Sequence, residues 1–226
     1  MVKIKNIKKS NNNKSNNKSN GKYKKEQKQI VRLSQKEKLL KFLIENKNPQ
    51  SIRGASGAII IDYKNTHNIV NEFYPEVISK EKIGNTNLIR LNIVPNQDIY
   101  MVEDKRTKEF LFKNPGLSVI KKYVEEINYP FFIVLVFGSY AKDTKTEKSD
   151  IDICIISDNK DKERELIGKL NLLSLRLGIH EFTTKEFTSM IEKSQNNLGH
   201  EIIKKNIIIY GIENYYNLIS KWMKKE

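Results

Sequence analysis

Cysteine, histidine and long apolar segments are all scarce in this chain of 226 residues. The single cysteine, Cys154, excludes a disulfide within the chain and a metal site built from several cysteines. His180 and His200 have no second histidine or cysteine at ligand spacing, which argues against a histidine metal site. No apolar run approaches the length of a membrane span, and the first residues hold lysine and asparagine where a signal peptide is apolar. We therefore expect a soluble, cytoplasmic protein that contacts no membrane.

Positive charge is abundant but unevenly distributed. Of the formal net charge of +14, residues 1–28 contribute about nine, from ten lysines and one glutamate. This Lys/Asn-rich, low-complexity segment has no hydrophobic period, so we expect a disordered basic tail. Such a tail can bind nucleic acid by neutralising phosphates, or it can serve only to keep the chain in solution. The composition does not distinguish these two interpretations.

Residues 30–95 have the pattern of three short helices followed by a hairpin. Ser34 and Glu37 match a capping box, and the helix that they begin ends before Pro49. Further helices are predicted over residues 52–61 and 65–73, followed by a hairpin with a Gly-Asn turn. This order of elements is that of a winged helix-turn-helix, in which the third helix enters the major groove of DNA.

The predicted third helix begins with polar side chains that can reach base edges and phosphates. We expect DNA contacts from this helix and from the hairpin, namely from Lys64, Asn65, Thr66, His67, Asn68, Lys80 and Lys82. Winged helices also bind proteins, and the charge outside the tail is modest, so a protein partner for this region stays open as the alternative.

The rest of the chain alternates helices and strands. Residues 96–114 are predicted to form a connecting helix, and residues 115–226 a separate domain. Within that domain, strands are expected near residues 131–137, 151–156 and 179–183, with a long helix over residues 160–177. In this domain the strands are separated by helices, and it follows a region predicted to consist of helices and a hairpin. This order of elements predicts an α+β fold.

The most informative pattern joins Gly138-Ser139 to Asp150-Ile151-Asp152, with ten residues between them. Because side chains alternate along a strand, the two aspartates are expected to project from one face of the strand. Two carboxylates on one strand form a divalent cation site, and the Gly-Ser turn offers backbone amides and a hydroxyl to a phosphate. The pattern predicts metal-assisted chemistry on a nucleotide, and the alternative is a solvated turn beside two surface aspartates.

These same residues resemble the signature of the DNA polymerase β-like nucleotidyltransferase superfamily, and more narrowly that of the minimal nucleotidyltransferases. The C-terminal stretch from Leu198 to Tyr216 is also similar to the ends of such domains in archaeal-like proteins. The resemblance covers about residues 115–226. It implies a small mixed-sheet nucleotidyltransferase domain with flanking helices, behind the winged helix-turn-helix.

The resemblance also implies roles for the residues of the motif. Asp150 and Asp152 would hold Mg²⁺, with a two-metal site expected, and Gly138 and Ser139 would bind the outer phosphates of ATP or another nucleoside triphosphate. Lys142 lies in the same loop and can add a positive charge to those phosphates, although a lysine in a turn is often only solvated.

Members of the superfamily often use a third carboxylate on a later strand, which helps to bind the second metal and deprotonates the acceptor hydroxyl. Glu181 is the residue expected in this role. A slip of one residue in the strand would present His180 in its place.

Two functions follow as expectations. The first is Mg²⁺-dependent transfer of a nucleoside monophosphate, AMP from ATP, to an acceptor hydroxyl. The resemblance to minimal nucleotidyltransferases implies an antitoxin that modifies a partner toxin of the HEPN ribonuclease type. The second is a DNA-binding transcriptional regulator whose C-terminal domain binds nucleotide with little turnover.

Overall fold

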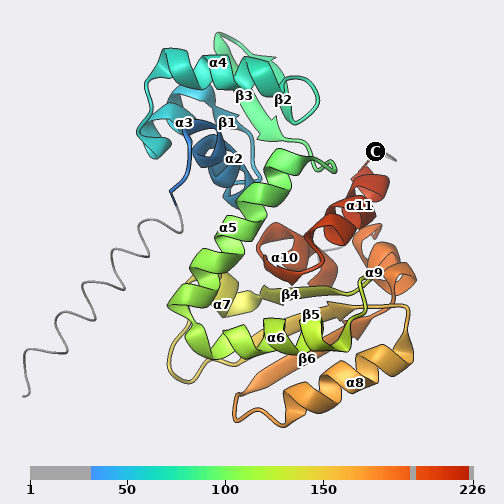
Figure 1. Ribbon diagram of the computed structural model, residues 1–226. Helices are drawn as coiled ribbons and strands as arrows, with labels where there is room; N and C mark the ends of the chain where they lie inside the picture. The colour runs from blue at the N-terminus through green and yellow to red at the C-terminus, as the bar shows by residue number, and fades with distance from the viewer. Residues whose placement is uncertain (1–31, 194–196, 224–226) are drawn as a thin grey trace, which may run out of the picture. The chain divides into compact units, whose positions relative to one another are not determined.

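The computed structural model describes residues 32–193 and 197–223 (Figure 1). The predicted basic tail, residues 1–28, lies outside the described residues. Helices and strands alternate around two hydrophobic core clusters. In the described ranges, no helix is long and apolar enough to cross a membrane.

Three helices and a small sheet make up the first part. In chain order, the elements are α2 (Gln35–Glu45), β1 (Gln50–Ser51), α3 (Ile52–Ile59), α4 (Tyr63–Phe73), β2 (Ile78–Ile83) and β3 (Thr86–Leu91). Ser34 and Glu37 form the predicted capping box at the start of α2. β3 lies between β1 and β2 and is antiparallel to both. The hairpin turn contains Gly84 at φ +59°, a conformation that glycine adopts readily.

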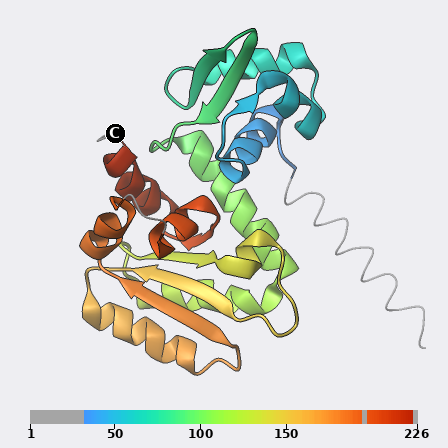
Figure 2. The ribbon, with the colours of Figure 1, turned by 180° about the vertical axis from the view of Figure 1, so that it is seen from behind.

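A long helix, α5 (Gln97–Lys113), leads from the hairpin to a second sheet. The small sheet and the second sheet lie at opposite ends of this helix (Figures 1 and 2). A 3₁₀ turn, η1 (Pro115–Leu117), and helix α6 (Ser118–Ile127) follow α5. α5 thus falls within residues 96–114, where a connecting helix was predicted.

The second sheet has four strands in the order β6-β5-β4-β7. They are β4 (Ile133–Phe137), β5 (Ile151–Ile156), β6 (Leu177–Phe182) and β7 (Ile207–Tyr210). β4 is antiparallel to β5 and to β7, whereas β5 and β6 are parallel. The sheet is thus mixed, and the expectation of an α+β fold is confirmed.

Helices cover both faces of this sheet (Figure 1). On one face, α6 and α8 (Lys160–Asn171) pack against Val134, Val136 and Ile153. The opposite face, with Leu135 and Cys154, is covered by α9 (Thr184–Ile191), α10 (Leu198–Lys204) and α11 (Ile212–Met223). Asp152 belongs to this second face, because it alternates with Ile153 along β5.

The helix predicted over residues 160–177 is shorter in the structure. α8 ends at Asn171, and Leu177 begins β6 opposite Ile151 of β5. Leu173 and Leu177 continue the helical spacing of the sequence, but strand pairing with β5 decides the conformation of Leu177. The prediction failed because the helical pattern continued past the end of the helix.

One hydrophobic core cluster extends from the first part of the chain to the second sheet. It contains Leu39 and Leu40 of α2, Val102 of α5, Leu135 of β4 and Ile219 of α11. Each of these side chains is fully buried. The two parts of the described chain are therefore packed on a shared core.

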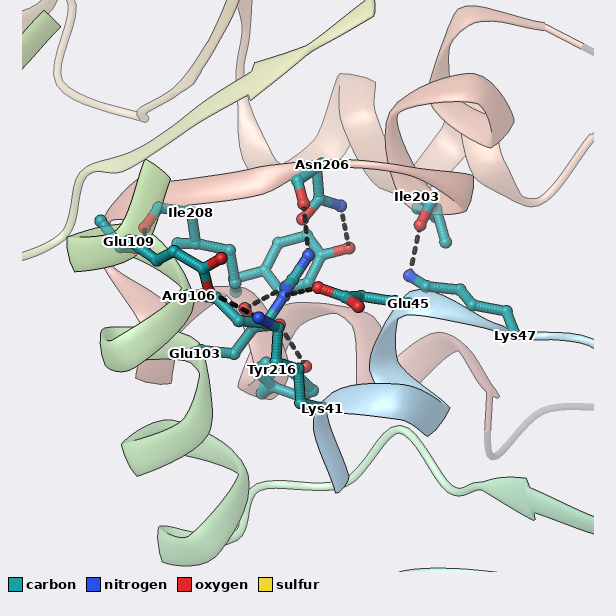
Figure 3. Close-up of polar contacts among 12 residues, drawn as sticks. Lys41, Glu45, Lys47, Glu103, Arg106, Glu109, Ile203, Asn206, Ile208 and Tyr216 are labelled. Atoms are coloured by element: carbon teal, nitrogen blue, oxygen red, sulfur yellow. Dashed lines mark hydrogen bonds and ion pairs between the residues drawn. The ribbon is translucent and has the colours of Figure 1, made fainter. Parts of the chain in front are cut away.

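A buried polar cluster around Arg106 of α5 adds to this connection (Figure 3). The guanidinium group forms an ion pair with Glu103, and its Nε lies 3.4 Å from Oε1 of Glu45 on α2. Its Nη2 donates to the carbonyl oxygen of Asn206 at 3.2 Å, and the Tyr216 hydroxyl donates to Oε1 of Glu103 at 2.8 Å. Burial acts to lower the pKa of Arg106, but the two carboxylates outweigh it and raise that pKa above its ordinary value.

Candidate active site

The Gly-Ser segment and the acidic strand meet at the end of β4. Phe137 pairs with Asp152 across the antiparallel β4–β5 pair, and Gly138 begins the short helix α7 (Gly138–Lys142). At Gly138, φ is +66°, and an added Cβ would overlap the Asp152 carboxylate and lie 3.0 Å from its Cγ. Only glycine satisfies both the backbone conformation and the space that the carboxylate occupies.

The two aspartates have different environments. Asp152 is half-buried on β5, whereas Asp150 lies one residue before the strand and is exposed. Burial raises the pKa of Asp152, and the charges of Asp150 and Glu201 raise it further, against the opposing effect of His180 and Lys142. The negative charge on Asp152 is therefore poorly compensated, and a bound cation would stabilise it.

The register of β5 and β6 decides which side chain of β6 shares the face of Asp152. Asp152 pairs with Gly178, and Cys154 pairs with His180. Because side chains alternate along a strand, His180 lies on the face of Asp152 and Glu181 on the opposite face. This register corrects the expectation that Glu181 supplies a third carboxylate next to the two aspartates.

Glu181 lies instead near Glu163 of α8. The Glu163 side chain is 1% exposed; its Oε1 accepts from Lys160 Nζ at 2.7 Å, and its Oε2 has no hydrogen-bond partner in the described part of the chain. Burial and the nearby charge of Glu163 raise the pKa of Glu181. A proton shared by the two carboxyl groups would satisfy the buried oxygen.

Lys142 forms an ion pair that the sequence did not predict. Its Nζ lies 2.7 Å from Oε1 of Glu201 on α10, and this contact lowers the pKa of Glu201. Ser139, the second residue of α7, is partly buried beside Gly138. The structure thus places Ser139, Lys142 and Asp152 at one end of the sheet, together with Glu201.

Asp150 and Asp152 are the two carboxylates of the motif that could hold a divalent cation, and Asp150 already lies 3.6 Å from Arg176 Nε. In residues 32–193 and 197–223, no three His, Cys, Asp or Glu side chains gather closely enough to hold a metal ion. Mg²⁺ is commonly bound through one or two carboxylates, with water and substrate phosphates as the other ligands. Asp150 and Asp152 fit such a site, because their oxygens are the ligand type that Mg²⁺ prefers and the nucleotide can supply the rest.

The part of the chain that contains these residues is similar in sequence to known proteins. The family model described as "Polymerase beta, Nucleotidyltransferase" matches residues 119–215. A Methanocaldococcus jannaschii protein named "putative protein adenylyltransferase" is 31% identical over 100 residues, which cover 42% of this chain and 72% of that protein. The chain belongs to the polymerase β-like nucleotidyltransferase family. No solved structure matches it.

Most of the residues predicted to contact DNA are accessible in this nucleotidyltransferase. Lys64, Asn65 and Asn68 are exposed on α4, and Lys82 is exposed on β2. Thr66 is fully buried, and its Oγ1 donates to the carbonyl oxygen of Asp62 at 3.0 Å. The inclusion of Thr66 among the DNA contacts is therefore wrong, because its side chain faces the interior.

The other two predicted contacts are already engaged within this region. Nδ1 of His67 lies 3.1 Å from Nδ2 of Asn71, and Oδ1 of Asn71 accepts from Lys80 Nζ at 2.5 Å. The Lys80 ammonium also lies 4.3 Å from the centre of the Tyr74 ring. These contacts connect the hairpin to α4.

Two residues beside the aspartates of this nucleotidyltransferase were missed from the sequence. Arg176 Nε lies 3.6 Å from Oδ1 of Asp150, and Glu201 pairs with Lys142. No local spacing connects either residue to the motif. The similarity of the stretch from Leu198 to known domain ends was the one signal that pointed toward Glu201.

Proposed function

We propose that the protein transfers a nucleoside monophosphate, AMP from ATP, to a hydroxyl group of an acceptor. The observation that carries this proposal is the contact of Gly138 with the Asp152 carboxylate. A phosphate-binding turn and a metal-binding carboxylate must adjoin if both are to hold one triphosphate. Membership of the nucleotidyltransferase family supports the reaction class, and the name of the relative supports adenylyl transfer.

In the proposed reaction, the acceptor oxygen forms a bond to the α-phosphorus, and the bond between that phosphorus and the oxygen bridging to the β-phosphate breaks. Pyrophosphate leaves with the electron pair. Asp150 and Asp152 would hold Mg²⁺, which supplies positive charge at the triphosphate when bound. The side chain of His180, on the face of Asp152, takes the place expected for a third carboxylate and accepts the hydroxyl proton.

The turn after β4 binds the outer phosphates in this proposal. Gly138 lets them approach the backbone closely, and the Ser139 hydroxyl donates to a phosphate oxygen. Lys142 exchanges its Glu201 partner for the phosphates, because the pair is about half exposed and exposed ion pairs are weak.

Transfer can be measured with labelled ATP, Mg²⁺ and candidate acceptors on the full-length protein. Asp150→Asn and Asp152→Asn should each reduce transfer by about 100-fold or more, since each removes a carboxylate at the reacting phosphate. The matched control is Asp161→Asn, at an aspartate 92% exposed on α8, which should leave transfer unchanged. Transfer that persists in both site variants would contradict the proposed mechanism.

We further propose a protein as the acceptor, in the form of a toxin for which this chain is the antitoxin. The word "protein" in the name of the relative supports a protein acceptor. Label should then appear on the product of an adjacent toxin-like gene when it is incubated with the enzyme and ATP. Label confined to nucleic acid or to small molecules would count against this acceptor.

DNA binding is the second candidate function. We propose that residues 30–95 are a winged helix-turn-helix set ahead of the transfer domain, in an archaeal-like arrangement, and that it reads DNA as part of a regulator. Three exposed polar side chains on α4, Lys64, Asn65 and Asn68, support this. Replacing all three with Ala in the full-length protein should weaken binding to its own upstream DNA about tenfold or more in a gel shift.

The control for this gel shift is Lys122→Ala, at an exposed lysine of α6, which should leave binding within about twofold. Equal binding by the triple variant and the control would assign the DNA contact to another region. If Asp150→Asn still binds DNA and the wild-type protein shows no transfer, the hypothesis of a DNA-binding regulator is preferred over that of a transferase.

A further inference from the structure

Two adjoining cavities lie next to the candidate active site. The smaller, about 180 Å³, and the larger, about 450 Å³, share Glu45, Lys142 and Lys205 in their walls. The larger is lined only by charged and amide side chains: Glu45, Asn46, Lys47, Asn48, Gln50, Lys142, Glu201, Lys204 and Lys205. It therefore lies between the segment after α2 and the end of α10, beside the Lys142–Glu201 pair.

Positive charge is in excess in the larger cavity. Its two carboxylates are both engaged, because Glu45 pairs with Arg106 and Glu201 with Lys142. In the part of the chain that the structure describes, neither Lys204 nor Lys205 lies within ion-pair distance of a carboxylate, although the charge of Lys204 helps to lower the pKa of Glu201. These two ammonium groups are available to an anion from solution.

Lys47 is affected by burial first and by the neighbouring charges second. Its Nζ donates to the carbonyl oxygen of Ile203, as Figure 3 shows. Burial and the positive charges of Arg106 and Lys205 lower the pKa of Lys47 to about 8, against the opposing charge of Glu103. The cations around Lys47 repel one another, and an anion bound between them would relieve that repulsion.

We propose that the larger cavity binds a chain of phosphate groups through Lys47, Lys204 and Lys205. Lysine is a common point-charge partner of phosphate, and the side-chain amides of Asn46, Asn48 and Gln50 can donate to the remaining oxygens. The cavity wall has no aromatic ring for base stacking, so the site suits phosphates rather than bases. A volume of about 450 Å³ leaves room for more than one phosphate group.

Two sources can supply this chemistry, the backbone of a nucleic-acid strand and the phosphate tail of a free nucleotide. Asp150 and Asp152 do not line this cavity, although Lys142, which we place at the outer phosphates of ATP, does. Phosphate binding through Lys47, Lys204 and Lys205 requires no transfer reaction. It can be measured without Mg²⁺ and in Asp152→Asn, so that its failure and the failure of the proposed transfer are distinguishable.

The experiment uses the full-length protein and two probes, inorganic tripolyphosphate and a labelled single-stranded oligonucleotide of about eight residues without a terminal phosphate. The test variant carries Lys204→Ala and Lys205→Ala. The matched control carries Lys122→Ala and Lys185→Ala, which remove the same charge from exposed positions of α6 and α9 and leave the N-terminal lysines in place. Calorimetry gives the affinity for tripolyphosphate, and fluorescence anisotropy at several salt concentrations gives that for the oligonucleotide.

The test variant should bind at least one probe about tenfold more weakly than the control variant does. If the oligonucleotide is the probe affected, the plot of log affinity against log salt should also become shallower by about one unit, as expected for loss of one to two phosphate contacts. An effect on tripolyphosphate alone identifies a nucleotide tail, and an effect on the oligonucleotide identifies a strand. Lys204→Arg with Lys205→Arg should restore binding, which a merely structural defect of the alanine variant would not predict.

Two results would overturn the proposal. One is an affinity of the test variant for both probes that equals that of the control variant. The other is an equal loss of affinity for a polyglutamate peptide of matched charge, since that would show a site for any polyanion, such as an acidic protein segment, rather than for phosphate.

Discussion

Glu201 holds Lys142, a residue 59 positions earlier in the chain, with Oε1 2.7 Å from Nζ. The pair joins α10 to the turn that carries Gly138 and Ser139. It places a carboxylate where we propose that the outer phosphates of the nucleotide bind. The nucleotide must therefore compete with a residue of the protein for the same ammonium group.

The first prediction concerns this competition. Glu201→Gln should lower the KM for ATP about two- to fivefold, because an exposed ion pair is worth up to about 1 kcal/mol. Steady-state kinetics over a range of ATP concentrations measures the change. Glu165→Gln, which removes an exposed partner of Lys162 on α8, serves as control and should leave KM unchanged. A higher KM in Glu201→Gln would mean that Glu201 contributes to binding rather than opposing it.

Gly138→Ala should abolish detectable transfer and lower the melting temperature. The added Cβ would overlap the Asp152 carboxylate, and alanine is strained at φ +66°. Gly168→Ala is the control, because Gly168 lies on α8 with open space around it and alanine favours a helix by about 0.5–1 kcal/mol. Thermal unfolding measures the melting temperatures of both variants, and the ATP assay measures their transfer activities. An active Gly138→Ala protein would show that this close contact is not required.

Arg106→Met should reduce the free energy of unfolding by about 3–5 kcal/mol, because it leaves the Glu103 carboxylate buried without its cation. Urea denaturation measures the loss. Lys162→Ala removes the partly exposed partner of Glu165 and should cost less than about 1 kcal/mol. A loss of the same size in both variants would indicate that the cluster around Arg106 is hydrated and contributes little.

The proximity of Glu163 to Glu181 leads to a prediction of how the stability of the folded protein depends on pH. The folded protein raises the pKa of Glu181, so it binds that proton more tightly than the unfolded chain does. The contribution of Glu181 to stability is therefore fully present below its ordinary pKa of about 4.5 and is lost as pH rises through the raised value. Glu163→Gln removes the neighbouring charge and should flatten this decline.

Melting temperatures between about pH 4 and pH 7 measure that decline for the wild type, Glu163→Gln and the control Glu165→Gln. Only Glu163→Gln should change the slope, since Glu165 is exposed and pairs with Lys162. Parallel curves for all three proteins would mean that Glu163 and Glu181 do not share a proton.

Sequence patterns predicted the fold correctly where the structure of a segment depends mainly on its own residues. Ser34 and Glu37 began α2 as expected, and the apolar runs before Gly138 and after Asp150 became the adjacent strands β4 and β5. These cases succeed because capping and strand burial depend on neighbouring residues. The glycine and the aspartate of the motif were brought together by the pairing of those two strands.

The predictions that failed depended on contacts between distant segments. The face on which Glu181 lies follows from the pairing of β6 with β5, and a shift of one residue reverses it. Thr66 is the exception, because it lies three and four residues before Ile69 and Val70 and the helical period alone places it on the buried face of α4. Arg106 is separated from Asn206 by 100 residues, so no local pattern could have revealed their contact.

The core that runs from Leu39 of α2 to Ile219 of α11 limits how this protein can be re-engineered. A transfer domain cut out of the chain at residue 115 would expose apolar surface that α2 and α5 now cover, and should be prone to aggregate. Fusing residues 30–95 to another enzyme would expose the complementary surface. Residues 30–95 and the transfer domain should therefore be transferred to another protein together, as one unit.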